Sequence, residues 1–271
     1  MITSIINPYN YQEYYNNNEL INDPFIITLE KDIEKYDNAS HILEKLQLHP
    51  MKFNAINGKD LKISRSDIFD KFKGLNDGEI GCFISHFLIY YLASQHSNPE
   101  QYTMIFEDDI GSNIDATLLN NKLKDVIRYN KDLIYLGKCA EFCFMIKPIY
   151  DDLYQGYQPL CMHAYMIKNS FAKKVVDDIN KLKIIDIPID QIISKSVSGN
   201  SILEYHPSLF YQDPKYPSNL RGTMLQIANE LECKDMPNLP KKLIKVHQNK
   251  IMIILIIIAI IIVIICLYKM N

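Results

Sequence analysis

Short apolar runs alternate with stretches of helical periodicity between residues 23 and 233, and this alternation constrains the fold more than any other feature of the chain. Four largely apolar runs are typical of buried strands: residues 25–29, 102–106, 133–136 and 164–167. Residues 33–46 and 170–182 carry helical periods. Strands that alternate with helices predict an α/β domain.

Composition excludes several classes of protein. Of the 271 residues 48% are hydrophobic, which is enough to build one large core. The net charge is −3 and the lysines and arginines are scattered, so we expect no nucleic-acid partner. The six cysteines lack the spacing of a disulfide framework, which predicts reduced, buried thiols.

Four segments are expected along the chain. Residues 1–22 have no apolar period and predict a flexible arm, followed by the α/β domain at 23–235. Prolines and lysines at 236–250 predict a basic linker. Residues 251–268 carry no charge and, as a helix, would measure ~27 Å, which is close to the thickness of a bilayer core. A buried core helix would normally keep one polar face, so a transmembrane helix is the better interpretation.

Residues 76–92 predict an amphipathic helix. Asn76 can cap its start, with Glu79 as the capping-box partner. An apolar stripe follows at helical spacing: Ile80, Phe83, Ile84, Phe87, Leu88, Tyr91 and Leu92. Ser85 and His86 lie off this stripe and can face a cleft, although a lone histidine is more often a packed or surface residue.

The strand 102–106 ends in Glu107, Asp108 and Asp109. Three adjacent carboxylates repel one another unless water or a cation neutralises them. Alternation along an extended strand predicts that Glu107 and Asp109 point one way and Asp108 the other. Hard oxygen ligands suit Mg²⁺ or Mn²⁺, and this edge of an open α/β sheet is where ligands bind. By itself such a triplet is more commonly an acidic turn in solvent.

The two features together resemble glycosyltransferase family 25. Residues 78–86 read GEIGCFISH, and an apolar strand ending in EDD follows about twenty residues later. Weaker similarities extend over residues 24–221, with NAING at 54–58, DLIYLG at 132–137 and IPID at 187–190. The family includes the lipooligosaccharide galactosyltransferases of bacteria and the collagen hydroxylysine galactosyltransferases of animals.

This resemblance implies a GT-A type fold and inverting transfer of a hexose, galactose or glucose, from a UDP-sugar to a glycan or hydroxylysine acceptor. A divalent ion, Mn²⁺ or Mg²⁺, would neutralise the leaving diphosphate, held by Asp109 and Glu107, with His206 able to complete its shell. The implied donor contacts are Ser85, His86, Glu107 and Asp108. Asp190, at the start of a short helix after Pro188, is the candidate general base, although a charge there can also serve the helix start.

Other interpretations remain open at this point. The family usually carries an arginine after its first strand, whereas Lys35 is the nearest cation here, and lysine cannot copy bidentate recognition. This departure favours a catalytically inactive transferase fold that binds glycans or acts as a scaffold at a membrane. A metal-dependent hydrolase would also use the acidic triplet. A rival zinc site would combine four side chains: Cys139, Cys143, Cys161 and His163.

The orientation of the membrane segment follows from charge. Four lysines precede the span within ten residues, and Lys269 alone follows it. With free cysteines and no signal peptide, this predicts a C-terminal single-pass anchor with the catalytic domain in the cytosol. The sequon at Asn38 offers a reporter, because it can be glycosylated only in the lumen.

Overall fold

The computed structural model describes residue 2 and residues 20–139, 141, 145–197 and 201–216. The chain divides into two units, Met1–Cys233 and Lys234–Asn271, and the second lies wholly outside the described residues. The predicted arm at 1–22, apart from residues 2 and 20–22, the basic linker at 236–250 and the span at 251–268 also lie outside them. Among the residues that the structure describes, no helix combines the length and apolar character needed to cross a membrane.

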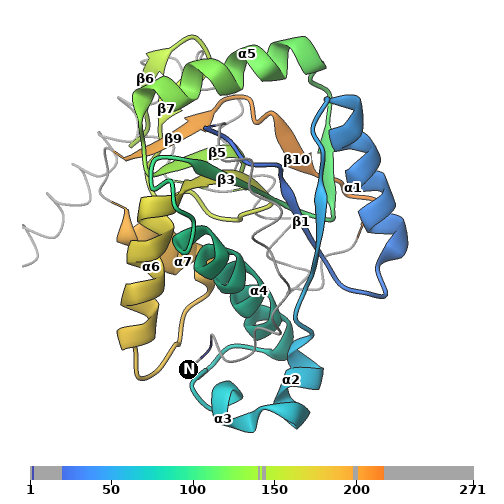
Figure 1. Ribbon diagram of the computed structural model, residues 1–271, viewed down its shortest axis with the longest axis vertical. Coiled ribbons are helices and arrows are strands. Elements are labelled where there is room, and N and C mark those ends of the chain that lie inside the picture. Colours follow the sequence, from blue (N-terminus) through green and yellow to red (C-terminus); the bar gives the residue numbers. More distant parts are fainter. Residues whose placement is uncertain (1, 3–19, 140, 142–144, 198–200, 217–271) are drawn as a thin grey trace, which may run out of the picture. The chain divides into compact units, whose positions relative to one another are not determined.

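A central sheet of eight strands organises the domain (Figure 1). In spatial order its strands are β2 (Met51–Asn54), β1 (Phe25–Thr28), β3 (Tyr102–Glu107), β8 (Ala164–Lys168), β5 (Leu133–Gly137), β9 (Ile202–Tyr205), β7 (Leu153–Gln155) and β6 (Lys147–Tyr150). A separate two-stranded sheet joins β4 (Ile110–Ser112) to β10 (Phe210–Gln212). The mixed α/β class is confirmed, and each predicted strand agrees with an observed strand to within one residue at either end.

Strand direction decides where polar side chains gather. β1 runs parallel to both β2 and β3, with Ile27 paired to Glu107. The carboxyl ends of these strands therefore lie at one edge of the sheet, which is the edge that binds ligands in open α/β sheets. β8 runs antiparallel to β3, so at this edge it contributes its beginning instead.

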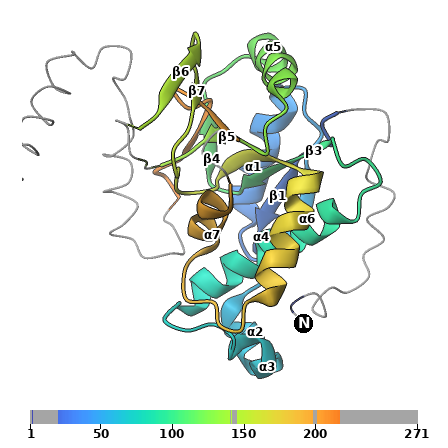
Figure 2. The ribbon, with the colours of Figure 1, turned by 90° about the vertical axis from the view of Figure 1, so that its left-hand side faces the viewer.

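Helices cover both faces of the sheet, as Figures 1 and 2 show. The apolar side chains of α4 (Asp77–Ser94), α6 (Asn169–Lys181) and α7 (Ile189–Ser196) form one buried cluster with alternate strand residues such as Ile105. Those of α1 (Ile33–Lys45) and α5 (Ala116–Val126) form a second cluster with the intervening residues, such as Met104. This division follows from the two-residue period of strands. A short 3₁₀ turn, η3 (Ile127–Tyr129), follows α5.

Helix α4 is the element that most directly positions the site. Its predicted capping box is confirmed, because Asn76 Oδ1 accepts from the N–H of Glu79 at 2.9 Å and Glu79 Oε2 accepts from the N–H of Asn76 at 2.8 Å. Burial extends beyond the predicted stripe, since Ser85 and His86 are also inside. The single-stripe expectation is therefore wrong: α6, α7, α2 and the sheet enclose the helix on several sides.

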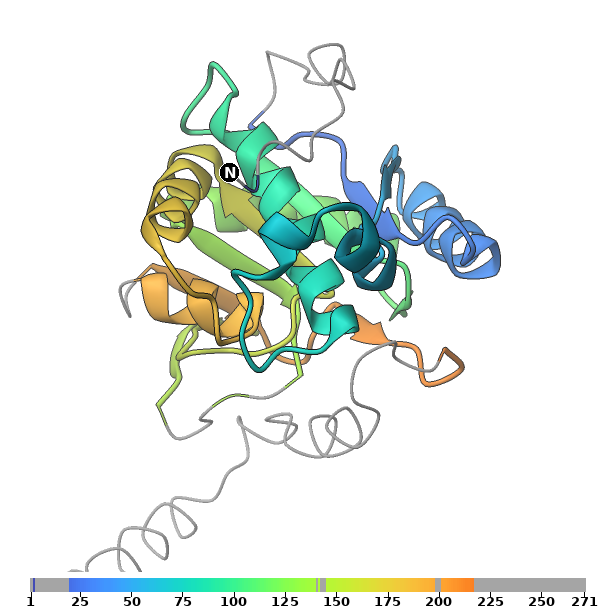
Figure 3. The same cartoon turned by 90° about the horizontal axis from the view of Figure 1, so that it is seen from below.

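Two glycines allow another segment to cross the start of α4. Helices α2 (Gly58–Ser64) and α3 (Ser66–Phe69) lie beside this end of α4 (Figure 3). A Cβ on Gly81 would lie 2.4 Å from the carbonyl oxygen of Ile56, and one on Gly58 would lie 1.7 Å from that of Asp77. One turn further along α4, Ser85 Oγ accepts from the N–H of Ile56 at 2.8 Å. Backbone can approach this closely only where no side chain intervenes.

Candidate functional site

A cavity of about 270 Å³ opens at the carboxyl ends of β1 and β3, against the start of α4. Its wall joins residues from four parts of the chain, which include Thr28, Lys31, Lys35, Asn57, Cys82, His86 and the triplet 107–109. A pocket of about 640 Å³ shares the segment Ala55–Asn57 with it and extends toward α2. A cavity is therefore present at the sheet edge where the sequence predicted a ligand site.

All three carboxylates of the triplet line this cavity. The predicted alternation of their side chains is wrong, because β3 ends at Glu107 and the chain turns at Asp108 and Asp109 before β4 begins. The period of two applies only while the backbone stays extended. The turn thus brings together three negative groups where a straight strand would have separated them.

Burial makes Asp108 and Asp109 weaker acids than ordinary aspartates. It raises the pKa of Asp108 to about 6, against the hydrogen bond from Thr28 and the charge of Lys35. It also raises the pKa of Asp109 to about 7, and the charges of Glu107 and Asp108 add to the effect. Lys35 Nζ lies 3.9 Å from Asp108 Oδ1, too far for a close ion pair. The cavity therefore holds more negative than positive charge near its floor.

Asp109 offers a free ligand atom to a cation. Its Oδ2 accepts from Gln212 Nε2 at 3.2 Å, whereas its Oδ1 is buried and makes no hydrogen bond to any residue that the structure describes. A buried acceptor without a donor is costly unless a cation or water satisfies it. Carboxylate oxygens are also the ligands that Mg²⁺ and Mn²⁺ prefer. The acidic group therefore fits the divalent ion that the family implies.

His86 and Ser85 are both committed to protein contacts. His86 Nε2 lies 3.2 Å from Glu107 Oε1. Although burial opposes ionisation, the hydrogen bond and charge of His86 hold the pKa of Glu107 below its usual value. Ser85 is fully buried; its hydroxyl donates to the carbonyl of Gly81 at 2.7 Å and accepts from Ile56. Ser85 thus shapes the cavity by joining two segments of backbone.

Asp190 lies in the first turn of α7. Its carboxylate accepts from the N–H of Cys161 at 3.2 Å and from the N–H of Gln191 at 2.8 Å. Burial raises its pKa despite these two donors, and the charge of Glu107 contributes in the same direction. Such a carboxylate holds a proton more readily than an exposed one, which suits a group that must accept a proton during a reaction.

His206 lies in a different cluster from the acidic triplet. Its Nε2 is 2.8 Å from Glu204 Oε1 and 3.0 Å from Glu141 Oε1, and within the described part of the chain its Nδ1 makes no hydrogen bond. Lys138 contacts the same Glu141 oxygen. The structure therefore does not bring His206 to Asp109, because the turn after β9 directs its ring toward these buried carboxylates.

The cysteines also differ from the prediction. Cys139 and Cys161 form a disulfide, so the prediction of reduced thiols is wrong for this pair. The disulfide also removes the rival zinc site, because neither of its sulfurs is a thiolate. Of the other two candidate ligands, Cys143 lies outside the described residues, and His163 Nε2 lies within hydrogen-bond distance, 3.2 Å, of the carbonyl oxygen of Phe210. Cys139 and Cys161 are 22 residues apart, which is not a spacing typical of a disulfide framework, so no sequence pattern predicted their pairing.

Sequence reasoning missed the buried tyrosines behind the site and the position of Cys82 in its wall. Tyr165 OH lies 2.8 Å from His86 Nδ1 and 2.7 Å from Tyr90 OH. Tyr90 and Cys82 each stand four residues from His86, a spacing that places them near it on the helix. Tyr165 comes from β8 and could be found only from the tertiary structure.

Fold and cavity together define an α/β domain whose candidate ligand cavity lies at the carboxyl ends of parallel strands. The family model described as Glycosyltransferase family 25 (LPS biosynthesis protein) matches residues 21–151. This stretch includes the motifs at 78–86 and 107–109, and the match agrees with the family that these motifs predict.

Two curated relatives have the same family name. A "Glycosyltransferase 25 family member" of Drosophila pseudoobscura pseudoobscura is 30% identical over 129 residues, which cover 42% of this chain and 20% of the relative. A protein of the same name from Drosophila melanogaster is 26% identical over 130 residues, with the same coverage. The chain thus spans about a fifth of the length of these relatives.

Among solved structures, the galactosyltransferase LgtC in complex with donor and acceptor sugar analogs is 9% identical, with a TM-score of 0.37. That match covers 77% of this chain and 94% of the other. The apo-form glycosyltransferase GlyE of Streptococcus pneumoniae is 12% identical, with a TM-score of 0.38, covering 79% of this chain and 60% of the other.

Proposed function

We propose that this domain transfers a hexose, galactose or glucose, from a UDP-sugar to a glycan or hydroxylysine-type acceptor, with inversion, on a GT-A type fold. The observation that carries the proposal is the acid-lined cavity at the ends of β1 and β3, within the matched family region. Its lining holds three carboxylates together with two lysines, Lys31 and Lys35. A nucleoside diphosphate held there through a divalent ion would balance these opposite charges.

Asp109 and Glu107 would hold that ion, Mn²⁺ or Mg²⁺. The unpartnered Oδ1 of Asp109 supports this assignment, together with the all-oxygen character of the group. Once bound, such an ion lowers the barrier by neutralising charge on the departing diphosphate. Asp108 and His86 are left to orient the donor, His86 through its contact with Glu107.

Asp190 would act on the acceptor side as general base. Inversion by a single displacement requires a group that takes the proton of the acceptor hydroxyl as the new glycosidic bond forms. Two backbone N–H groups hold the Asp190 carboxylate in place, and burial keeps its proton affinity high. Both properties suit that role.

The direct test combines binding with turnover. We expect UDP and Mn²⁺ to raise the melting temperature together by more than the sum of their separate effects, because each completes the other's site. Asp109→Asn should lose this coupling, while the exposed control Asp186→Asn keeps it. Radiolabelled UDP-galactose and UDP-glucose, with manganese, then measure donor hydrolysis and transfer. Coupled binding without any turnover would instead support an inactive glycan-binding or scaffold protein.

We also propose the membrane anchor at 251–268 with the domain in the cytosol, and the structure changes how this should be tested. The side-chain nitrogen of Asn38 is buried in α1, so the sequon is a poor reporter. The Cys139–Cys161 disulfide also removes the argument from free cysteines. Acid quenching followed by alkylation of thiols measures the compartment directly: cytosolic placement predicts both sulfurs alkylated in cells. A protected pair would place the domain in an oxidising compartment.

A further inference from the structure

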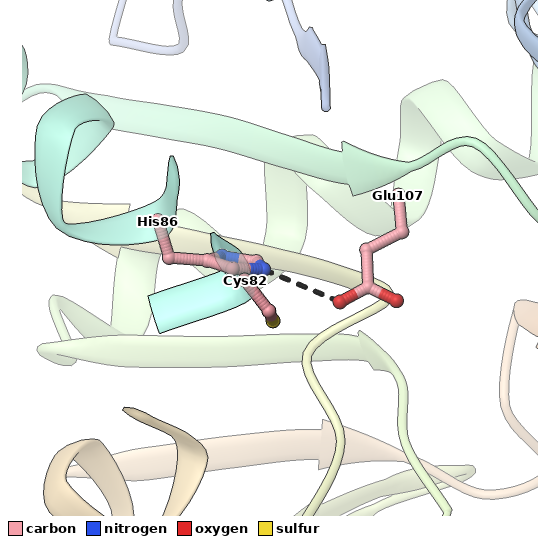
Figure 4. A group of neighbouring side chains, drawn as sticks. All are labelled: Cys82, His86 and Glu107. Carbon is pink, nitrogen blue, oxygen red and sulfur yellow. Dashed lines mark hydrogen bonds and ion pairs between the residues drawn. The ribbon is translucent and has the colours of Figure 1, made fainter. Parts of the chain in front are cut away.

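Cys82, His86 and Glu107 form a compact group of mixed ligands in the wall of the cavity (Figure 4). Cys82 and His86 are four residues apart on α4, so their side chains lie on the same side of the helix. Glu107 approaches them from the end of β3. One sulfur, one nitrogen and one oxygen all lie within 4.8 Å of one another. This is the ligand count of an exchangeable zinc site.

A chain of buried hydrogen bonds decides which nitrogen of His86 carries a proton. Tyr90 OH donates to Met162 Sδ at 3.6 Å. Its oxygen must therefore accept from Tyr165 OH at 2.7 Å, and the Tyr165 oxygen must accept from His86 Nδ1 at 2.8 Å. Only this direction of donation satisfies all three contacts. His86 therefore keeps its proton on Nδ1 and turns Nε2 toward Glu107.

This arrangement leaves two ways to bridge the 3.2 Å between His86 Nε2 and Glu107 Oε1. A second proton can lie between them, which makes an imidazolium–carboxylate pair. A metal ion can replace that proton, because the Nε2 lone pair and the carboxylate are both ligands. Metal-binding histidines almost always donate their other N–H to a fixed partner, and Tyr165 already fills that role here.

The ligand set selects a different ion from the one that the triplet would hold. Thiolate and imidazole prefer Zn²⁺ and similar soft or borderline ions, whereas carboxylates alone prefer Mg²⁺ or Mn²⁺. Ligands around a tetrahedral zinc ion lie roughly 3.6 Å apart, so no separation within the 4.8 Å limit would have to shorten by more than about 1.2 Å. Cys82 is only half-buried, and the cavity provides both access and a free coordination position.

We propose that Cys82 Sγ, His86 Nε2 and Glu107 bind a thiophilic divalent cation such as Zn²⁺. Binding displaces the proton between His86 and Glu107 and the thiol proton of Cys82. Because Glu107 also belongs to the site proposed for the donor and its metal, zinc at this position inhibits donor binding. That consequence rests on the proposed function, whereas the metal site itself does not.

Cobalt(II) tests the site without any reference to catalysis, because a thiolate bound to cobalt gives a strong near-ultraviolet charge-transfer band. We expect wild-type protein to develop this band and to lose it when zinc is added. Cys82→Ser should abolish the band or weaken cobalt binding tenfold or more, while Cys233→Ser, the matched control, should leave it unchanged. Equal melting temperatures without metal establish that the variants are folded. An unchanged band in Cys82→Ser would overturn the site.

His86→Gln provides an independent check, since it keeps a polar side chain but removes the imidazole ligand. We expect it too to lose the cobalt band. The inhibitory consequence is tested by UDP and Mn²⁺ binding at increasing zinc, where wild type should lose affinity at least tenfold and Cys82→Ser should not. A cobalt band without zinc inhibition would overturn the competition and the donor-site role of Glu107, and leave the metal site established.

Discussion

Two groups of carboxylates with a nearby histidine occur in this domain, and they differ in how their charge is balanced. The group of Glu107, Asp108 and Asp109 faces an open cavity, and its nearest lysine nitrogen stays 3.9 Å away. The group of Glu141, Glu204 and His206 has almost no exposed side-chain surface and contains Lys138 as a direct partner. We call the first the open group and the second the closed group.

This difference in charge balance indicates which of the two groups is suited to bind a ligand. Burial raises the pKa of Glu204 to about 7. Burial opposes the ionisation of His206, but the hydrogen bonds that it donates to Glu141 and Glu204 raise its pKa. The closed group therefore has Lys138 and His206 as its own partners, as structural ion pairs do. In the open group His86 contacts Glu107, but Lys35 stays 3.9 Å from Asp108 and Asp109 Oδ1 has no partner among the described residues, so this group is suited to an external cation.

The largest expected effect separates the two groups by activity. Asp109→Ala should lower transfer on the order of a thousandfold or more and remove the coupling between UDP and Mn²⁺, since the open group loses its metal ligand. Glu204→Gln in the closed group should keep that coupling. Isothermal titration with UDP in the presence and absence of manganese measures both. Wild-type turnover by Asp109→Ala would show that the open group is not the metal site.

Stability should show the opposite pattern. Lys138→Met should lower the free energy of unfolding by about 3 kcal/mol, because it leaves buried carboxylates without their cation. Lys181→Met, at an exposed pair with Asp178 at 3.0 Å, should change it by less than about 1 kcal/mol. Urea denaturation provides the measurement. Adding Glu204→Gln to Lys138→Met should recover part of the loss, and failure to do so would mean that charge balance does not stabilise the closed group.

Asp190→Asn should affect only the chemical step. We expect transfer to fall about a hundredfold, the typical contribution of a general base, while UDP binding changes little. The amide keeps an oxygen that can accept from the N–H of Cys161 or Gln191, so the fold should persist. Single-turnover kinetics beside UDP titrations separate the two effects. Weakened UDP binding would reassign Asp190 to the donor side of the open group.

The smallest expected effect concerns pH. Folded Asp109 holds its proton up to about pH 7, whereas an unfolded aspartate releases it near pH 4. Between these values the folded state binds more protons, so this residue's contribution to stability is present below about pH 4 and is lost as pH rises through 7. Asp109→Asn should therefore be more stable than metal-free wild type at pH 8 and equally stable at pH 4.

Thermal melts at both pH values test this, with the exposed Asp186→Asn as the control that shows no such change. A gain for Asp109→Asn that is equal at pH 4 and pH 8 would contradict a buried, proton-holding carboxylate. It would mean that the open group is hydrated well enough to remain charged at both values.

Local pattern was sufficient to predict much of this molecule. Each predicted strand has its observed counterpart, and the capping box at Asn76 forms as expected, because short-range periodicity and capping depend on neighbouring residues. The motif at 78–86 and the acids at 107–109 meet at one cavity, because a helix packed on a sheet brings its start to the strand ends. The same motifs predicted the family whose model matches residues 21–151.

Only the tertiary structure decided what depends on residues far apart in the chain. The chain turns at Asp108, so the side chains of the triplet do not alternate as they would along a strand. His206 contacts Glu204 in the closed group and not the triplet. The Cys139–Cys161 disulfide joins chain segments with no sequence signal. Tyr165, from a strand 79 residues beyond His86, fixes the proton of that imidazole. The physical reason is common to all four outcomes. Each depends on which distant residues pack together in the interior, and the local sequence pattern does not specify long-range packing.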